Sequence, residues 1–452
     1  MTNLQKIKAL SRSTSSIQAP GSNVIRQPRN LDPALHPFER AREYTRALNA
    51  TKIERMFAKP LLGSLGRGHV DGVYKITTDP SSLERLASGS GDGVVKVWDL
   101  ASRDEIWQAK AHENIVRGLC WSRDKKLLSC ASDRTIKIWD PYNSELASNE
   151  PVASWLGKDA YTSISHHRHT PHFAVSSSSG IAIYDSTRPG SSASTRLAWP
   201  NSVDTISSVT FNQVETSLLA STASDRSVVL YDLRTSTALH RTVLTLSCNA
   251  LAWNPMEAFT LAAASEDHNI YIFDSRAMGR ALNVLKDHVA AVMDVGWAPT
   301  GAALVSASYD RTLRLWERGR GHSRDVYHAR RMQRVFSAAW SADNAFVLSG
   351  SDDGNVRLWR ADAAARQGVT TFKQRQALQE ADALKKRYGH MPEIKRIARH
   401  RHLPKVVKRA AEIKGEELAA IKRREENERK HSKKGEKRRR PEREKMVLAV
   451  EE

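Results

Sequence analysis

A segment ending in Trp98 recurs roughly every 40–45 residues along most of the chain. The run GDGVVKVWD at 91–99 returns as SDRTIKIWD at 132–140, and five further copies also end in an aromatic residue. The seven terminal aromatics are separated by 41, 45, 47, 42, 43 and 43 residues, and they are Trp98, Trp139, Tyr184, Tyr231, Phe273, Trp316 and Trp359. Self-similarity at one period predicts stacked structural units, each of which buries its apolar face against its neighbours.

Each unit consists of short strands separated by turns. In the second unit, the runs 116–121, 126–131 and 135–139 are rich in β-branched and aromatic residues and are bounded by Asp, Ser and Gly. Ile136 and Ile138 alternate with Lys137, so one strand face is apolar. A unit of this length is typical of the WD40 β-propeller, with four strands per blade. We therefore predict an all-β seven-bladed WD40 β-propeller over residues 68–360, flanked by a basic N-terminal extension and an α-helical C-terminal extension.

Polar side chains recur at fixed places in the units. A His opens several of them, at His69, His112 and His288. A Ser precedes the aromatic by ten residues at Ser88, Ser129, Ser221, Ser306 and Ser349. An Asp precedes it by six residues at Asp92, Asp133, Asp225, Asp267, Asp310 and Asp353. Because the same set is repeated in blade after blade, we interpret it as a structural hydrogen-bond chain and not as a Ser-His-Asp catalytic triad.

The third unit departs from this pattern. Ser178 replaces the turn Asp, and Tyr184 replaces Trp. Its middle carries four histidines, His166, His167, His169 and His172. Histidine binds zinc, but no Cys pair or acidic partner stands at ligand spacing. We predict a polar blade with an exposed loop, and neither a metal nor a cofactor.

A propeller must close its ring. Many propellers close because the chain before the first blade supplies the outer strand of the last blade. The apolar run 57–65 (FAKPLLGSL) lies at that place in the sequence. We expect it to be the closing strand.

The net charge of +20 is concentrated in the two extensions. Residues 1–67 have a net charge of +8 and residues 361–452 a net charge of +12, which leaves the propeller near zero. Basic arms on a neutral core are the electrostatic pattern of a polyanion binder. The three cysteines form no disulfide framework, which indicates a reducing, intracellular compartment. The chain carries neither a secretory signal nor an apolar run long enough to span a membrane.

The extensions contain helical patterns. We expect a disordered Ser-rich arm at 1–30, and an N-terminal extension at 31–67 that contains a short helix at 37–48. In the C-terminal region, 361–452, we expect helices at 371–388, at 393–402 and from 404 onward, with Gly415 as a possible break. The apolar stripe of these helices is too narrow for an independent core. We expect the helices to lie on another surface, which could be the propeller, RNA or a neighbouring protein.

These extensions resemble those of the Sof family of WD40 proteins. The resemblance rests on HPFERAREY at 36–44, on PEIKRIARHRHLPK at 392–405 and on the segment that begins PEREKMV at 441. It implies a nucleolar scaffold of the small-subunit processome that contributes to 18S pre-rRNA processing and 40S subunit assembly. The implied partners are processome proteins, a small nucleolar ribonucleoprotein and pre-ribosomal RNA. We expect no catalysis and no membrane contact, and a monomer within a large complex located in the nucleus and nucleolus.

Two basic clusters are candidate contacts. The first is predicted to touch RNA or a processome protein, the alternative being that it docks on a propeller edge or on an acidic protein, and it comprises Lys395, Arg396, Arg399, His400, Arg401, His402 and Lys405. The second resembles a nuclear-import signal and comprises Lys430, Lys433, Lys434, Lys437, Arg438, Arg439 and Arg440.

A further motif implies another partner. The fourth and fifth units continue past the aromatic as YDLR, which ends in Arg234, and as FDSR, which ends in Arg276. Paired aromatic-Asp-x-Arg ends resemble the motif by which WD40 substrate receptors bind the adaptor of the cullin-four ubiquitin ligase. Tyr and Phe stand here in place of Trp, so an exposed Arg at a blade end is the alternative. An enzyme is the third hypothesis, and no Walker-type loop, helicase, nuclease or metal signature supports it.

Overall fold

The computed structural model describes residues 32–142, 150–199, 205–365, 368–433 and 439–451, so the Ser-rich arm expected at 1–30 lies outside the described residues. The chain divides into two compact units. The smaller contains the described residues up to Ala58 together with Ala364–His400, and the larger contains Lys59–Ala363 with Arg401–Glu452. The C-terminal region therefore contributes to both units, whereas the sequence led us to expect one region. Within the described ranges, no helix is long and apolar enough to cross a bilayer.

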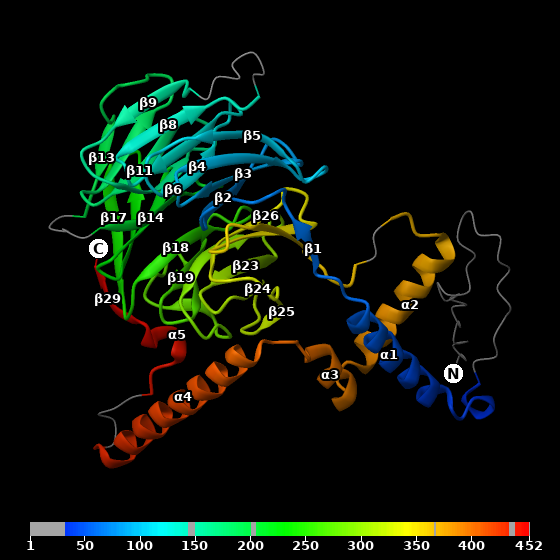
Figure 1. Ribbon diagram of the computed structural model, residues 1–452. Coiled ribbons are helices and arrows are strands. Elements are labelled where there is room, and N and C mark those ends of the chain that lie inside the picture. Colours follow the sequence, from blue (N-terminus) through cyan, green and yellow to red (C-terminus); the bar gives the residue numbers. More distant parts are fainter. Residues whose placement is uncertain (1–31, 143–149, 200–204, 366–367, 434–438, 452) are drawn as a thin grey trace, which may run out of the picture. The chain divides into compact units, whose positions relative to one another are not determined.

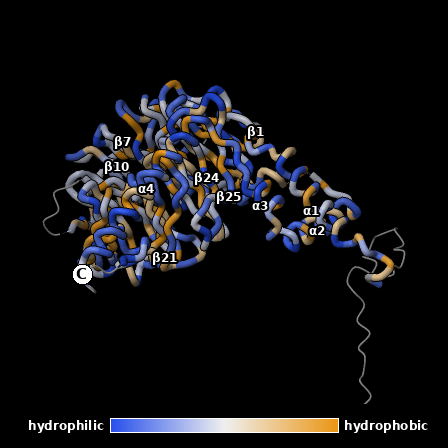
Figure 2. The backbone as a smooth tube through the Cα atoms, turned by 90° about the horizontal axis from the view of Figure 1, so that it is seen from below, coloured by the Kyte–Doolittle hydropathy of each residue, from blue (hydrophilic) through white to orange (hydrophobic). Residues whose placement is uncertain are grey.

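The larger unit is a seven-bladed β-propeller (Figure 1). The first strands of neighbouring blades contact one another around the ring, so they are the innermost strands. Apolar segments concentrate among these packed strands (Figure 2). From the inside outward, the antiparallel blades are β2 (Val73–Thr78), β3 (Arg85–Ser90), β4 (Val94–Asp99) and β5 (Glu105–Lys110); β6 (Val116–Trp121), β7 (Leu127–Ala131), β8 (Thr135–Trp139) and β9 (Ala153–Leu156); β10 (Tyr161–His166), β11 (His172–Ser177), β12 (Ile181–Asp185) and β13 (Thr195–Leu197); β14 (Ile206–Phe211), β15 (Leu218–Ala223), β16 (Ser227–Asp232) and β17 (Thr237–Leu244); β18 (Cys248–Trp253), β19 (Thr260–Ser265), β20 (Ile270–Asp274) and β21 (Ala281–Leu285); β22 (Val292–Trp297), β23 (Ala303–Ser308), β24 (Leu313–Glu317) and β25 (Ser323–Tyr327); and β26 (Val335–Trp340), β27 (Phe346–Ser351), β28 (Val356–Arg360) and β1.

Strand β1 (Leu61–Ser64) is the outer strand of the seventh blade although it precedes the first blade in sequence. It pairs antiparallel with β28, with Leu61 opposite Trp359. Backbone bonds of 2.8 Å from Arg360 N–H to the Pro60 carbonyl and of 2.9 Å from Leu65 N–H to the Val356 carbonyl extend the pairing. Leu65 is fully buried between the first and last blades. The ring is thus closed by hydrogen bonds and by apolar burial.

Buried hydrogen bonds cross the blades in which the repeat is complete. In the sixth blade, His288 Nδ1 lies 2.8 Å from Asp310 Oδ2, and Nε2 lies 2.7 Å from Ser306 Oγ, which also accepts a 2.8 Å bond from Trp316 Nε1. Burial lowers the pKa of His288, so the imidazole is neutral and donates from Nδ1 to the carboxylate. Related bonds join His112, Ser129, Asp133 and Trp139 in blade two, His69, Ser88 and Trp98 in blade one, and Ser349 and Trp359 in blade seven.

The recurring Asp has a second task in the turn between the second and third strands. Its Oδ1 accepts the backbone N–H two residues later at 2.9–3.4 Å in six blades. The residue between them has a left-handed φ of 64° to 82°. Four of these residues are not glycine, so the Asp bond stabilises a backbone conformation that L-residues seldom adopt. The Asp residues are Asp92, Asp133, Asp225, Asp267, Asp310 and Asp353.

The third blade replaces this network with other contacts. The Tyr184 hydroxyl lies 3.2 Å from that of Tyr161. His167 Nδ1 accepts the backbone N–H groups of His169 and Thr170, and His166 Nε2 lies 3.2 Å from Ser122 Oγ of the second blade. These histidines therefore hold their own loop and a neighbouring blade. Among the residues that the structure describes, no three His, Cys, Asp or Glu side chains are grouped so that they could hold a metal.

The smaller unit consists of α1 (Glu39–Met56), α2 (Phe372–Tyr388) and α3 (Pro392–Arg399), preceded by the 3-10 turn η2 (Pro33–Leu35). The helix expected at 37–48 is wrong at both ends, because Pro37 precedes the helix and the helix continues to Met56. The chain contains no Gly or Pro between Phe38 and Ala58, and α1 contacts both α2 and α3. Contacts within this unit therefore cover part of the apolar surface for which we expected an external partner.

The remaining C-terminal elements belong to the larger unit. Helix α4 (Lys405–His431) continues through Gly415, where a break was considered, because the good helix formers around it outweigh a cost of about 1 kcal/mol. After α5 (Glu442–Lys445), the chain ends in strand β29 (Val447–Glu451), which pairs antiparallel with β17 as a fifth strand of blade four. The expectation of a wholly helical C-terminal region is wrong here. A short apolar run takes its conformation from the edge that it pairs with.

Two N-terminal deletions test the closing strand. Deleting residues 1–66 removes β1 and Leu65, exposes the edge of β28, and should lower the melting temperature of the propeller by at least about 5 °C, given the burial of one large apolar side chain and several hydrogen bonds. Deleting residues 1–58 removes α1 but keeps β1, so the main transition of the propeller should stay within about 2 °C of the full chain. Equal melting curves for the two deletions would contradict this role of β1.

Candidate nucleic-acid and partner interface

The basic segment predicted to contact RNA is divided between the two units. Residues 392–400 lie in the smaller unit, and residues 401–405 begin the part that belongs to the larger unit. The segment is therefore not one continuous binding surface. Each part has its own environment.

Helix α3 presents a basic surface within the smaller unit. Ile394 is buried, and Pro at the first helical position starts the helix. Lys395, Arg396 and Arg399 are exposed and lie three and four residues apart, so they share one side of the helix. In the described part of the chain, no carboxylate lies within ion-pair distance of these three side chains. They are placed to contact phosphate groups.

The acidic residues of the smaller unit are used within it. Glu43 accepts from Arg387 at 2.9 Å and from the Tyr388 hydroxyl at 2.7 Å. Lys385 Nζ lies 2.6 Å from Glu54, so α1 and α2 are joined by two ion pairs. In the same unit, Tyr44 donates to Glu393 at 2.9 Å, and this bond raises the pKa of the Tyr44 hydroxyl.

The surplus charge of this unit is therefore basic. Its three helices contain 13 Lys or Arg and 6 Asp or Glu residues, a net charge of +7. Several carboxylates are neutralised by neighbours, while Arg40, Arg42 and Arg46 on α1 are exposed together with the basic residues of α3. This separation generates a positive potential on the outer surface of the unit.

Arg401 and His402 have a different role, because they dock the chain on the sixth blade. Arg401 Nε donates to the Arg324 carbonyl at 2.9 Å and lies 3.3 Å from Asp325 Oδ1 on β25. The His402 ring stacks on His328 with centroids 5.6 Å apart. Burial, assisted by His402, lowers the pKa of His328, so this pair is neutral. For these two residues, the structure shows the propeller-edge contact that was the alternative to an RNA contact.

The other predicted residues have diverse surroundings. His400 is exposed at the end of α3, and Lys405 is exposed at the start of α4. Lys430 pairs with Glu426 one helical turn away at 3.4 Å. Lys433, Arg439 and Arg440 are exposed, while Lys434, Lys437 and Arg438 lie outside the described residues.

Two anchors of the C-terminal region were missed by the sequence analysis. Lys414 of α4 donates to the His288 carbonyl at 2.8 Å and is partly buried. Glu451 of β29 lies 2.9 Å from Arg241, which also binds Asp225 at 2.8 Å. The alternating run VLAVE was the available signal for β29, but no sequence signal indicated that Lys414 would face a blade.

The Arg residues of the ligase-type motif stand at equivalent places on blades four and five. Arg234 and Arg276 each follow the third strand of their blade, and their side chains are 76% and 64% exposed. Arg276 forms two bonds of 2.8 and 3.0 Å to Asp274 and lies over the Phe259 ring. Arg234 is held more loosely, at 3.5 Å from Asp232. Both guanidinium groups remain accessible to a partner.

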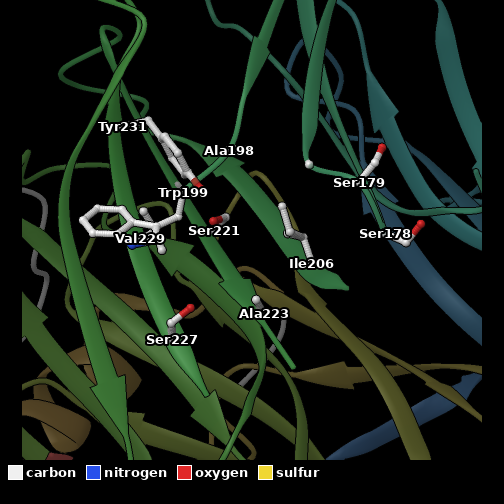
Figure 3. Close-up of a pocket in the computed structure, with 11 residues that line it drawn as sticks. Ser178, Ser179, Ala198, Trp199, Ile206, Ser221, Ala223, Ser227, Val229 and Tyr231 are labelled. Atoms are coloured by element: carbon white, nitrogen blue, oxygen red, sulfur yellow. The ribbon is translucent and has the colours of Figure 1, made fainter. Parts of the chain in front are cut away.

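A small crevice between blades three and four is the remaining candidate (Figure 3). It is lined by Ser178 and Ser179 of the degenerate turn and by Trp199, Val229 and Tyr231. Its volume of about 20 Å³ has room for one water molecule and no larger ligand. We assign it to the looser packing of the third blade.

Comparisons with known proteins agree with this architecture. The Sof1-like domain model matches residues 361–447, and the WD domain, G-beta repeat model matches residues 60–99, 104–140, 240–274, 279–317 and 320–360. The repeat matches cover five of the seven blades, and the blades outside them include the degenerate third one.

Full-length relatives are similar along nearly the whole chain. Protein SOF1 of Saccharomyces cerevisiae is 47% identical, with 94% of this chain and 91% of the relative covered. Protein sof1 of Schizosaccharomyces pombe is 50% identical, with 99% and 100% covered. DDB1- and CUL4-associated factor 13 of Xenopus laevis is 45% identical, also with 99% and 100% covered.

Replacing Arg401 by Ala should loosen the start of α4 from the sixth blade. The change removes bonds to a carboxylate and a carbonyl, so local stability should fall by about 1–3 kcal/mol. Hydrogen exchange of the backbone amides in 405–414 should become faster. Lys395→Ala is the matched control, because Lys395 has no carboxylate partner among the described residues, and it should leave that exchange unchanged. Equal exchange in both variants would show that Arg401 does not dock the helix.

Proposed function

The chain belongs to the Sof1-like family of WD-repeat proteins, and on this basis we propose that it is a non-catalytic scaffold of the small-subunit processome. In this role it contributes to 18S pre-rRNA processing and 40S subunit assembly through protein and RNA contacts. Its expected location is the nucleus and nucleolus. Its expected partners are processome proteins, a small nucleolar ribonucleoprotein and pre-ribosomal RNA.

The observation that carries the RNA contact is the basic surplus of the α1–α3 unit. Its carboxylates Glu43, Glu54 and Glu393 are engaged by neighbours, whereas Lys395, Arg396 and Arg399 have no such partner among the described residues. Cations of this kind bind phosphates with affinity and little sequence discrimination. Such binding suits an RNA that is folding and is held by several proteins at once.

The propeller supports the scaffold role in a different way. Its blades bury their polar residues in structural networks, as in the His288–Asp310 pair, and so leave them unavailable for chemistry. Blade edges and faces offer rigid surfaces on which partners assemble. We expect one copy of the chain within a large complex.

Reversing the charge of α3 tests the RNA contact. A variant with Lys395→Glu, Arg396→Glu and Arg399→Glu should lose most of its crosslinks to 18S precursor or guide RNA in cells. In vitro, the slope of log affinity against log salt should decrease by roughly 2, since each phosphate contact on a single strand contributes about 0.7.

The control reverses three exposed charges on outer blade segments, Lys110→Glu, Lys158→Glu and Arg196→Glu. It changes the net charge equally and leaves the 422–440 import region intact. If both triple variants retained their RNA crosslinks while processome proteins co-purified, the chain would act through protein contacts alone. A normal 18S precursor profile after depletion of the protein would contradict the processome role.

A second candidate function is that of a substrate receptor of a cullin-four ubiquitin ligase. The specific observation is the pair of exposed Arg234 and Arg276 at equivalent ends of adjacent blades. The name of the Xenopus laevis relative associates that protein with DDB1 and CUL4. In this chain, each Arg is oriented by an Asp two residues before it, which would limit the entropy lost when a partner binds.

The double variant Arg234→Glu, Arg276→Glu should reduce capture of the ligase adaptor at least about tenfold, because two charge-assisted contacts are lost. Pull-down from cells measures the capture. Arg188→Glu, Arg196→Glu on blade three provides a control of equal charge. Unchanged capture by the first variant would eliminate the receptor role without affecting the RNA result.

A further inference from the structure

The seven innermost strands share an irregularity at one position. Each pairs with its second strand through a register shift near its start, and the shift leaves one residue unpaired. A bulge of this kind redirects a side chain, and bulges occur often beside functional sites. Here all seven unpaired residues line one cavity of about 160 Å³ at the central channel.

The ring of bulge residues has two chemically different arcs. Blades seven, one and two supply Phe336, Tyr74 and Arg117. Blades three, four and five supply small polar residues, Thr162, Ser207 and Asn249, and blade six supplies Met293. The sequence places these residues 22 to 24 positions before the terminal aromatic of each unit. A ring that was only structural would repeat one residue type, as the turn Asp does.

The first arc forms a column of aromatic rings and guanidinium groups. Tyr74 and Phe336 stack with centroids 4.8 Å apart and planes 7° apart, and Tyr309 meets Phe336 edge-on at 5.9 Å. Arg117 lies 5.6 Å over Tyr74, and Arg334 lies 5.4 Å over Tyr309. Aromatic and Arg side chains presented together on a surface are typical of the anchoring residues of protein interfaces.

The cavity also contains donors without protein partners. Asp294 is neutralised, because it accepts from Lys75 at 3.2 Å, from Ser337 at 3.0 Å and from backbone N–H groups. Among the described residues, neither the Arg117 guanidinium nor the Ser207 and Ser208 hydroxyls have a hydrogen-bond partner. The uncompensated charge of the lining is therefore positive.

We propose that this channel mouth binds an extended segment of a partner protein, with one Asp or Glu side chain inserted beside Arg117 and the Ser207 and Ser208 hydroxyls. The aromatic column packs against the apolar residues that flank the inserted side chain. The carboxylates of Asp71 and Asp352 act on Tyr74 but do not line the cavity, so they do not oppose the inserted carboxylate directly. This inference goes beyond the processome role and does not depend on it.

The size of the cavity favours a peptide over other anions. Pockets for small molecules and cofactors start at about 300 Å³, nearly twice this volume. A phosphate of an RNA strand would have to bring a ribose and a base into the same space. A single carboxylate side chain reaches the donors while its backbone stays outside the ring.

Photocrosslinking at the channel identifies the occupant. The full-length tagged chain with p-benzoylphenylalanine in place of Ser207 is expressed in cells and irradiated, and the attached peptide is sequenced by mass spectrometry. The same peptide is then synthesised with a fluorescent label, and its anisotropy is titrated with unmodified protein. We expect a segment that contains Asp or Glu and whose affinity falls at least about tenfold on Arg117→Glu, the loss expected for a charge-assisted hydrogen bond.

Matched variants make the result decisive. Arg196→Glu, on the exposed outer strand of blade three, should leave the affinity unchanged, and Asp→Asn or Glu→Gln in the peptide should weaken binding as much as the change at Arg117. Arg117 is exposed, so its variants should keep the wild-type melting temperature, and Arg117→Gln is the milder second variant. Crosslinks to RNA, a captured peptide without an acidic residue, absence of any crosslink, or equal affinity of the Arg117 variants would each overturn the proposal. None of these readouts depends on pre-rRNA processing.

Discussion

Every blade has apolar faces that only its neighbours can cover, and this constraint organises the larger unit. The core clusters combine residues of adjacent blades, as where Leu348 and Val356 of blade seven meet Val73 and Trp98 of blade one. Close approach is part of the same packing. A Cβ on Gly350 would lie 2.7 Å from Val73 Cγ1, and one on Gly89 would lie 2.6 Å from Val116 Cγ1. Since no blade is complete alone, the ring must close, and the outer strand of the last blade comes from the start of the chain.

Exposed strand edges are the second consequence of a ring of small sheets. The outer strand of each blade has unpaired N–H and C=O groups that invite pairing with other chains. On blade four, this edge is covered by β29 from the C-terminus, with Arg241 joined to both Asp225 and Glu451. On blade six, the segment at Arg401 binds the outer strand through a backbone carbonyl and Asp325. The C-terminal region thus stabilises the propeller while its charged surface remains available to partners.

The charge map shows how local pairing produces a surface with a function. The α1–α3 unit is basic partly because several of its carboxylates pair with neighbours, so the remaining Lys and Arg face solvent without compensation. The channel mouth follows the same principle on a smaller scale, because Asp294 is satisfied by Lys75 and Arg117 is left free to bind an anion. At both places, the internal ion pairs decide which charges a partner meets.

Much of this protein can be read from residue order alone. The spacing of Trp98 and its six equivalents gives the number of blades, and the recurring Asp gives the turns, because periodicity and turn chemistry are local properties of the sequence. The basic extensions and the family resemblance of 392–405 are likewise visible without coordinates. What residue order could not give is which distant segments meet. Arg396 and Arg401 look equivalent in the sequence, yet one is exposed on α3 and the other is docked on blade six. The bulge residues lie 42 to 46 positions apart and form one ring only because the blades close. These placements depend on contacts between residues far apart in the chain, and only the tertiary structure decides those contacts.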